Sequence, residues 1–484
     1  MASEPPDEPL PFSYDSVSNG EYFPRPASAV EREAARRTRA LADRQAARHG
    51  MPRRRFLQSI CGAAGALFVL NACSSESNQS EGEPNGGRYR VPEEAMDEEE
   101  AAADAIGGDE FVFDVQTHFL EFGAGQALEF GRGFPQASCG ADDPRLCFSI
   151  DTYLEELFVR SDTRMAVISA VPIVGDDSPL SIARMEEGRR AADVLCGDGR
   201  LLLHGQVFPA VGSLGPALDG MNQLAAAHPI AAWKLYTHAP TGFYLDDHDP
   251  DAPQVGTAYL DRVREVGPPI VSIHKGLGNG SSYASPVDIG PAAAANPDLS
   301  FVVYHSGFES ATTEGPWTED TADTGVNRLV STLRDTGIGP GQNVYAELGS
   351  TWYITQRDPN EAAHLLGKLL LAVGPDNIVW GTDSIWYGSP QSQIEALRAF
   401  EITEAYQEEF GYPALTPEVK RKILGENAAR LYGIDPLTAR CEFTPEELAQ
   451  VRAEMPSVSP ATYGPTTAAQ IRAVATDHTF AWTA

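Results

Sequence analysis

The chain has 484 residues, in which 68 acidic side chains outnumber 36 basic ones and give a formal net charge of −32. This length suits one large domain with extensions rather than a single small domain. The acidic excess argues against binding to nucleic acid or to anionic lipid, because both partners are themselves negatively charged.

Residues 1–73 have the pattern of an export leader. Arg53 and Arg54 precede an apolar stretch, 60–72, that is rich in small residues. A twin arginine before a short apolar region resembles a Tat signal, and the stretch is too short for a stable membrane span. An ordinary amphipathic helix is the alternative. Cys73 ends a sequence similar to a lipobox, so the attachment of a lipid anchor at Cys73 is left open. We therefore expect the Tat machinery as a partner and a periplasmic or cell-surface location.

Residues 74–109 are polar and rich in Glu, Asp, Gly and Ser. They lack the apolar content to bury a core, and so predict a disordered acidic linker. Further along the chain, Cys139 and Cys147 could form a local disulfide if the protein is exported.

Residues 110–435 alternate short apolar runs with helical patterns. The runs are rich in Val, Ile, Leu and aromatic residues, as strands buried on both faces are. Eight β–α units over about 270 residues match the size of a closed (β/α)8 TIM-type barrel. A doubly wound open sheet is the alternative, but no Gly-x-Gly-x-x-Gly follows the first strand. The expected strands lie near 111–115, 165–172, 201–208, 231–236, 269–274, 300–305, 343–348 and 377–382.

Helices are expected between these strands, and a long stretch separates the first strand from the second. Residues 119–160 should hold an insertion over the barrel mouth, followed by a helix over Ile150–Arg160. Residues 416–432 predict a closing helix, with Thr416 as its N-cap and Pro417 at its first position. Residues 436–484 form a C-terminal extension. The expected helices include 181–196, 215–227, 256–266, 324–336 and 359–373.

Four of the expected strands end in a side chain that could take part in catalysis. His118, His274, His305 and Asp383 occupy these positions. The carboxyl ends of barrel strands meet at one rim, where catalytic sites form, so we expect the four to converge. His118, His274 and Asp383 could hold a divalent ion with a position open for water. His305 could move a proton or stabilise a developing oxyanion.

Other polar residues are candidates for the same site. Gln116 precedes His118 by two positions, so both side chains point to the same side of the strand. Glu347, on the seventh strand, faces the substrate or is structural. Lys234, on the fourth, could face the substrate or carry a bridging carboxylate. Trp386, in a loop at the mouth, could stack on a ring or seal the mouth.

Three further residues have a simpler interpretation. A lone histidine at a strand end is more often a hydrogen-bonded structural residue, and this is what we expect of His204 and His238. Asp114 is expected to be a hydrogen-bond partner at the end of its strand rather than a metal ligand.

Several segments resemble the amidohydrolase superfamily, particularly its amidohydrolase-related group. Residues 113–118 (FDVQTH) look like the group's opening D-x-H-x-H strand, and residues 380–383 (WGTD) are similar to its F-G-[ST]-D eighth strand. The resemblance spans residues 111–433. Further matching segments are 273–276 (IHKG), 304–307 (YHSG), 344–348 (VYAEL) and the closing helix 423–433 (ILGENAARLYG).

The resemblance implies His118 and His274 as metal ligands, Asp383 as ligand and general base, and His305 as an activating residue. Gln116 stands where the family's first histidine ligand belongs, and a neutral amide oxygen is a weak zinc ligand. The site could therefore hold zinc less tightly, prefer a harder ion such as Mn²⁺, or work without one. Hydrogen bonding through Gln116 is equally open. Barrels of this kind often pair, which suggests a homodimer.

The expected function is that of an exported, metal-dependent hydrolase with zinc as the expected ion. Asp383 would take a proton from metal-activated water, which attacks an amide, ester or lactone carbonyl of a small molecule. A decarboxylase on the same barrel is the first alternative. It needs a cation to hold the substrate carboxylate, and Arg and Lys are scarce at the strand ends. A metal-free binding protein on a degenerate barrel, marked by Gln116, is the second.

Overall fold

The computed structural model describes residues 9–437 except 123–138, 140–142, 176–177, 198, 279 and 310–312. It also describes residues 447, 450–452, 455 and 464–470. No helix within these ranges is long and apolar enough to cross a membrane.

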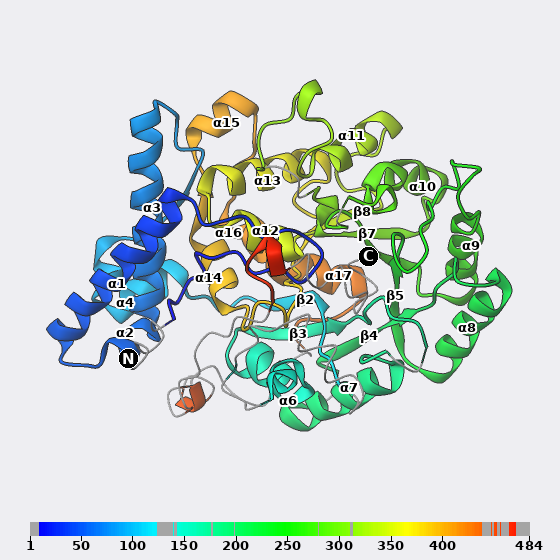
Figure 1. The fold of residues 1–484 in the computed structure, drawn as a ribbon, viewed down its shortest axis with the longest axis horizontal. Helices are drawn as coiled ribbons and strands as arrows, with labels where there is room; N and C mark the ends of the chain where they lie inside the picture. Colours follow the sequence, from blue (N-terminus) through cyan, green and yellow to red (C-terminus); the bar gives the residue numbers. More distant parts are fainter. Residues whose placement is uncertain are drawn as a thin grey trace.

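Eight parallel strands, hydrogen-bonded in chain order, form a nearly closed barrel (Figure 1). The Val115 amide donates to the Trp380 carbonyl at 3.0 Å, and the Asp383 amide donates to the Gln116 carbonyl at 3.0 Å, so the first and last strands meet. The expected (β/α)8 fold is confirmed. The strands are β2 (Val112–Thr117), β3 (Thr163–Ile168), β4 (Leu201–Gln206), β5 (Ile230–Tyr236), β6 (Ile270–His274), β7 (Ser300–Tyr304), β8 (Val344–Glu347) and β9 (Ile378–Val379).

The strands are apolar throughout because both of their faces are covered. In β7, Val302 and Tyr304 pack inside the barrel with residues of other strands, whereas Phe301 and Val303 pack in the main core with the surrounding helices. A strand of this kind has no solvent-facing side, which is why the sequence shows continuous apolar runs instead of alternation.

One or more helices follow every strand. The expected closing helix begins as predicted, since the Thr416 side chain accepts the Val419 amide at 3.3 Å and Pro417 occupies the first turn. It is continuous but contains a π-helical turn, η10. The helices of the barrel region are α6 (Ile150–Leu154), η4 (Glu155–Val159), α7 (Ile182–Cys196), α8 (Leu214–Ala227), α9 (Gly256–Val266), α10 (Ile289–Ala295), α11 (Asn327–Thr336), α12 (Gly349–Thr355), α13 (Pro359–Ala372), α14 (Gln391–Ala399), α15 (Glu404–Phe410), α16 (Pro417–Arg421), η10 (Lys422–Glu426) and α17 (Asn427–Tyr432). The short 3₁₀ helices are η3 (Pro144–Phe148), η6 (Ser282–Ala284), η7 (Pro286–Asp288), η8 (His305–Gly307) and η9 (Glu319–Thr321).

The N-terminal helices pack beside the barrel, at the left of Figure 1. Both α3, which contains the apolar stretch of the expected leader, and α4 contact α14. Cys73 lies in α3 and is buried. The elements are α1 (Ala29–His49), α2 (Arg53–Leu57), α3 (Ile60–Glu81), β1 (Gly87–Tyr89), η1 (Glu93–Met96) and α4 (Glu99–Ile106), and β1 pairs antiparallel with β10 (Phe400–Ile402).

Residues 74–109 differ from the expected disordered linker. They contain the end of α3, the strand β1 and the helix α4. Several of their apolar side chains, including Tyr89, Ala102 and Ile106, are almost completely buried. The segment is too polar to bury a core of its own, and the barrel and α3 supply the apolar surface that it lacks.

Two other expectations concern peripheral segments. Cys139 and Cys147 form a disulfide, as their spacing suggested. The expected insertion over residues 119–160 and the extension over 436–484 lie partly outside the described residues. Within the extension, the Pro465 carbonyl accepts the Ser18 amide at 2.8 Å, so it reaches the N-terminal segment.

Candidate active site

His118 and Asp383 meet where the barrel closes. His118 follows β2 and Asp383 follows β9, and His118 Nε2 lies 3.2 Å from Asp383 Oδ1. His118 Nδ1 donates to the Ser169 carbonyl at 2.6 Å, and this bond fixes the ring and leaves Nε2 facing the carboxylate. Both residues are nearly inaccessible to solvent. A histidine held through one nitrogen by a carbonyl is oriented as metal-binding histidines are.

Gln116 links this pair to His305. Its side-chain amide nitrogen donates to Asp383 Oδ1 at 2.9 Å and lies 3.3 Å from His305 Nε2. Its oxygen Oε1 is buried without a hydrogen-bond partner among the described residues. Gln116 therefore acts in this structure as a donor that connects two candidate catalytic groups.

Asp383 receives further donors at its other oxygen. Ser350 Oγ donates to Oδ2 at 2.7 Å, and Asn19 Nδ2 donates to the same atom at 2.8 Å. Burial acts to raise the pKa of Asp383, but the hydrogen bond with His118 and the charges of His305 and His118 outweigh it and hold the pKa below its usual range. Asp383 is thus a carboxylate at neutral pH.

His305 begins the turn after β7 and is held by Glu347. The backbone amide of His305 donates to Glu347 Oε2 at 2.8 Å, and both residues are fully buried. His305 has φ +58°, a left-handed conformation that costs energy for a residue other than glycine. Burial lowers the pKa of His305 to about 4, against the opposing charge of Asp383, so its ring is neutral at physiological pH. Glu347 positions His305.

His274, at the end of β6, lies among other aromatic rings. Its ring centroid is 4.8 Å from that of His305, 4.6 Å from that of His238 and 5.2 Å from that of Tyr236. Its Nε2 is buried without a hydrogen-bond partner among the described residues, and burial lowers its pKa well below the usual value.

Lys234 and Trp386 also contact residues of this site. Lys234, on β5, is fully buried, and its Nζ lies 3.6 Å from the ring centroid of Tyr304 without a hydrogen-bond partner among the described residues. Burial lowers the pKa of Lys234 to about 7, although nearby carboxylates oppose the shift. Trp386 lines a small cavity with Gln116, and its ring centroid is 6.2 Å from that of His118.

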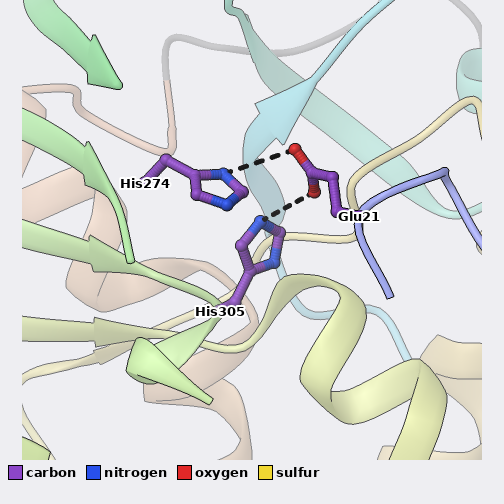
Figure 2. A group of neighbouring side chains, drawn as sticks. All are labelled: Glu21, His274 and His305. Carbon is purple, nitrogen blue, oxygen red and sulfur yellow. Dashed lines mark ion pairs between the residues drawn. The ribbon is translucent and has the colours of Figure 1, made fainter. Parts of the chain in front are cut away.

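The N-terminal segment also reaches the site. Glu21 Oε1 lies 3.7 Å from His274 Nδ1, and Glu21 Oε2 lies 4.0 Å from His305 Nε2 (Figure 2). Figure 2 shows the Glu21 carboxylate pointing between the two rings from a segment that precedes α1. Burial raises the pKa of Glu21 well above its usual value, with the charge of Asp383 acting in the same direction.

The side chains present are suited to a divalent ion. Among the described residues, Glu21, His274 and His305 form a group whose ligand atoms all lie within 4.8 Å of one another. Two neutral imidazoles and a carboxylate are a donor set that zinc and manganese accept.

The structure brings most of the predicted site residues together in a different grouping from the one expected. His118, Gln116, Asp383 and His305 form one connected set, whereas His274 contacts His305 and the N-terminal segment. The assignment of His118, His274 and Asp383 as ligands therefore stays a prediction. Asp114 is confirmed as a hydrogen-bond partner, because it accepts the Thr382 amide at 3.1 Å.

Sequence reasoning missed Glu21, Asn19 and Ser350. Glu21 and Asn19 belong to a segment that was interpreted as part of a leader, and nothing local marks them as neighbours of a barrel. His238, which the sequence predicts to be structural, has both ring nitrogens buried without a partner among the described residues, and it lies beside His274. Its position just after a barrel strand was the available signal. His204 is structural, as expected, since it bonds Ser169 and Tyr432.

Comparisons with known proteins agree with the resemblance. A family model described as Amidohydrolase matches residues 216–434, from α8 to the end of the closing helix, and supports a place in the amidohydrolase-related superfamily. No curated protein matches the sequence.

Solved structures similar to this chain include three with low sequence identity. An uncharacterised TIM-barrel protein from Bordetella bronchiseptica has a TM-score of 0.41 and 15% identity, over 66% of this chain and 99% of its own. A protein proposed to be a 2-pyrone-4,6-dicarboxylic acid hydrolase from Pseudomonas putida has a TM-score of 0.40 and 14% identity, over 67% of this chain and 98% of its own. The 5-carboxyvanillate decarboxylase from Sphingomonas paucimobilis has a TM-score of 0.39 and 13% identity, over 68% of this chain and 100% of its own. At these identities none of them carries an activity over to this chain.

Proposed function

We propose that this chain is a metal-dependent hydrolase that acts on an amide, ester or lactone bond of a small molecule. The observation that carries the proposal is the contact between His118 and Asp383 at the closure of the barrel, extended to His305 by Gln116. These residues come from three strand ends that are distant in sequence, and they meet at the rim where barrel enzymes place their catalytic groups.

Asp383 is the proton acceptor in this proposal. Its pKa is held below the usual range, so it is ionised at neutral pH and available as an acceptor, although the same shift makes it a weaker base. Gln116 and Ser350 donate to its two oxygens and fix the plane of the carboxylate. A fixed acceptor does not have to be reoriented when the reaction begins.

His305 is the second acid–base group. As a neutral imidazole it can donate a hydrogen bond to the carbonyl oxygen of a substrate or pass a proton to a leaving group. Its Nε2 lies close to the amide of Gln116, and Glu347 holds its backbone. The rigid turn at His305 keeps the ring directed at the site.

His118, His274 and Asp383 are the proposed ligands of a zinc or manganese ion. His305, whose ligand atom lies within 4.8 Å of that of His274, offers a further donor atom. When bound, such an ion supplies a Lewis acid that polarises a carbonyl and makes water more acidic. Because Gln116 uses its nitrogen as a donor, its role here is to orient Asp383 and His305.

Decarboxylation is the second candidate, and one observation favours it. Lys234 is a buried amine with no hydrogen-bond partner among the described residues, and the charges of Glu21 and Asp383 favour its protonated form. The sequence showed few cations at the strand ends, yet the fold places this one next to the site. A decarboxylase would use such a cation to hold the substrate carboxylate.

Metal analysis and product analysis test these proposals together. The purified full chain should contain near-stoichiometric zinc or manganese, and both His118→Ala and Asp383→Asn should lose it. A panel of lactones, esters and amides should show hydrolysis, whereas release of CO₂ from carboxylated aromatics would favour the lyase. Absence of metal, with stability unchanged by a chelator, would refute both enzyme proposals.

We further propose that the protein is exported by the Tat route. The twin arginine Arg53–Arg54 supports this, and so does the disulfide between Cys139 and Cys147, because disulfides persist mainly in oxidising compartments. In the folded chain Arg53 pairs with Asp43 at 3.3 Å, and α3 is packed against α1. Recognition of the signal would therefore require these helices to open. Lipidation of Cys73 and pairing into a homodimer stay predictions.

A further inference from the structure

A short N-terminal segment, residues 12–22, lies across the mouth of the barrel; we call it the strap. In Figure 1 it is the dark blue trace in front of the barrel near α12. Ser13 Oγ lies 3.1 Å from Tyr353 Oη of α12, and the Ser18 amide donates to the Pro465 carbonyl. Most of the strap, including Val17, Asn19 and Glu21, is buried.

The end of the strap is organised by its own hydrogen bonds. Asn19 Oδ1 accepts the Glu21 amide at 3.0 Å, and Asn19 Nδ2 donates to Glu21 Oε2 at 2.6 Å. The Tyr22 hydroxyl donates to the Val17 carbonyl and lies 3.4 Å from Tyr387 Oη. The strap is therefore held as a turn by its own hydrogen bonds, and this turn presents Asn19 and Glu21 to the barrel.

The two presented side chains contact the groups that the proposed chemistry requires. Asn19 donates to Asp383 Oδ2 at 2.8 Å. The Glu21 carboxylate lies between His274 and His305 at 3.7 and 4.0 Å. It is also close enough to Lys234 for a favourable charge interaction.

Little space is left beside the strap. The remaining cavity is lined by Asn19 and Glu21 together with Gln116, His118, Asp383 and Trp386, and measures ≈10 Å³. That is about the space of one water molecule, roughly 10–15 Å³, whereas pockets for small ligands typically measure about 300–1,000 Å³. A small-molecule substrate and the strap cannot occupy the mouth together.

We propose that the strap is a tethered ligand of the chain's own active site, and that Glu21 occupies the place of a carboxyl group on the substrate. This inference depends on the proposed function in taking the barrel mouth as the active site, and its consequence for opening the site depends on the proposed export. The substrate class it implies is a small organic acid whose carboxyl group sits near His274, His305 and Lys234. The strap competes with that acid.

The position of the strap in the sequence means that cleavage of the chain would end this competition. The strap precedes Arg53 and Arg54, so cleavage of an export leader near Cys73 would cut the strap from the barrel. While the chain is intact, the strap is held at the mouth at high effective concentration. After cleavage it becomes a separate peptide fragment that can dissociate, and the site opens.

Calorimetric titration of the full chain with benzoate tests the proposal without requiring turnover. If the strap is seated in about 90% of molecules, the apparent Kd of a competing ligand is about tenfold weaker than in an open site. Glu21→Ala should therefore bind benzoate about tenfold more tightly than the wild type or better. Benzamide, which has the same shape but no carboxyl group, should gain less affinity from this substitution. Asp15→Ala, which removes an exposed carboxylate from the same strap, is the matched control. It should change the affinity for neither benzoate nor benzamide.

Two further variants keep the test decisive. Glu21→Gln preserves the size of the side chain, so it reports on the carboxyl group even if Glu21→Ala does not fold, and it should also tighten benzoate binding. Lys234→Met in the Glu21→Ala chain should remove the gain.

Three results would overturn the proposal. These are unchanged benzoate binding in folded Glu21 variants, an equal gain for benzamide, or loss of bound metal on replacing Glu21, which would make it a ligand of the ion. Failure of the proposed function would appear separately, as absence of metal from the wild type and absence of turnover.

Discussion

Replacing Gly381 with alanine tests how tightly the candidate site is packed. A Cβ at this position would lie 1.9 Å from Glu347 Oε1, 2.7 Å from its Cδ and 3.0 Å from its Cγ. Glu347 is fully buried, and its other oxygen accepts the His305 amide at 2.8 Å. The carboxylate therefore cannot move away without releasing His305.

The expected cost has two parts. Overpacking a core typically costs ~1–3 kcal/mol, and leaving the buried His305 amide unpaired costs a further ~1–3 kcal/mol. Because both costs apply when the carboxylate is displaced, we expect Gly381→Ala to lower the free energy of unfolding by roughly 2–6 kcal/mol. Guanidinium unfolding followed by tryptophan fluorescence measures this. The metal content should also fall, because displacement of His305 disturbs the site.

Gly339→Ala is the matched control, because a Cβ there meets no atom within 4 Å. The double variant Gly381→Ala with Glu347→Ala should recover only the overpacking part of the loss, since it removes the atoms that collide but leaves the His305 amide without its acceptor. The reasoning would be refuted if Gly381→Ala stayed within about 0.5 kcal/mol of the control, which is the range of ordinary surface substitutions.

Three other predictions concern different parts of the chain. Burial raises the pKa of Glu156 from 4.5 to about 7, so its neutral form stabilises the fold below pH 4.5 and this contribution is lost as the pH rises through 7. Glu156→Gln should match the wild type near pH 4.5 and exceed it at pH 8 by on the order of 2–3 kcal/mol in denaturant titrations. Changing Arg53 and Arg54 together to lysine should trap the precursor in the cytoplasm, which cell fractionation detects. Replacing Cys139 and Cys147 with serine opens a short loop and should lower the free energy of unfolding by about 2–3 kcal/mol.

Each of these three has a clear opposing result. Equal pH dependence of stability for the wild type and Glu156→Gln would mean that Glu156 is ionised in the fold. Unaltered export of the twin-lysine chain, compared with an Arg55→Lys control, would exclude the Tat route. Equal stability of the serine variant and the non-reduced wild type would show that the disulfide does not constrain the unfolded chain.

The barrel could be predicted because its signal is local. Each strand, such as β7, is a continuous apolar run, and burial on both faces of a parallel strand requires that composition. The side chain after a run was predictable for the same reason: His305 and Asp383 interrupt an apolar pattern where the chain leaves the core. From these positions alone, convergence at one rim followed.

The partners of those side chains could not be predicted. The sequence suggests Gln116 as a weak metal ligand. Its role as a donor to both Asp383 and His305 depends on which of its two amide atoms faces them. The sequence allows Glu347 either a substrate contact or a structural role. In the structure its carboxylate accepts the backbone amide of His305 at the turn after β7. These choices are made by packing across the barrel, between residues far apart in the sequence.

The order of strands, their apolar character and the set of polar residues at their carboxyl ends were thus determined by the sequence itself, because each depends on neighbours along the chain. Tertiary structure alone decided that residues 74–109 are ordered and that Glu21 reaches His274 and His305. A polar segment acquires structure when another part of the chain supplies the apolar surface it lacks, and a side chain joins a distant site when folding brings it there. Neither condition is written in the local pattern of residues.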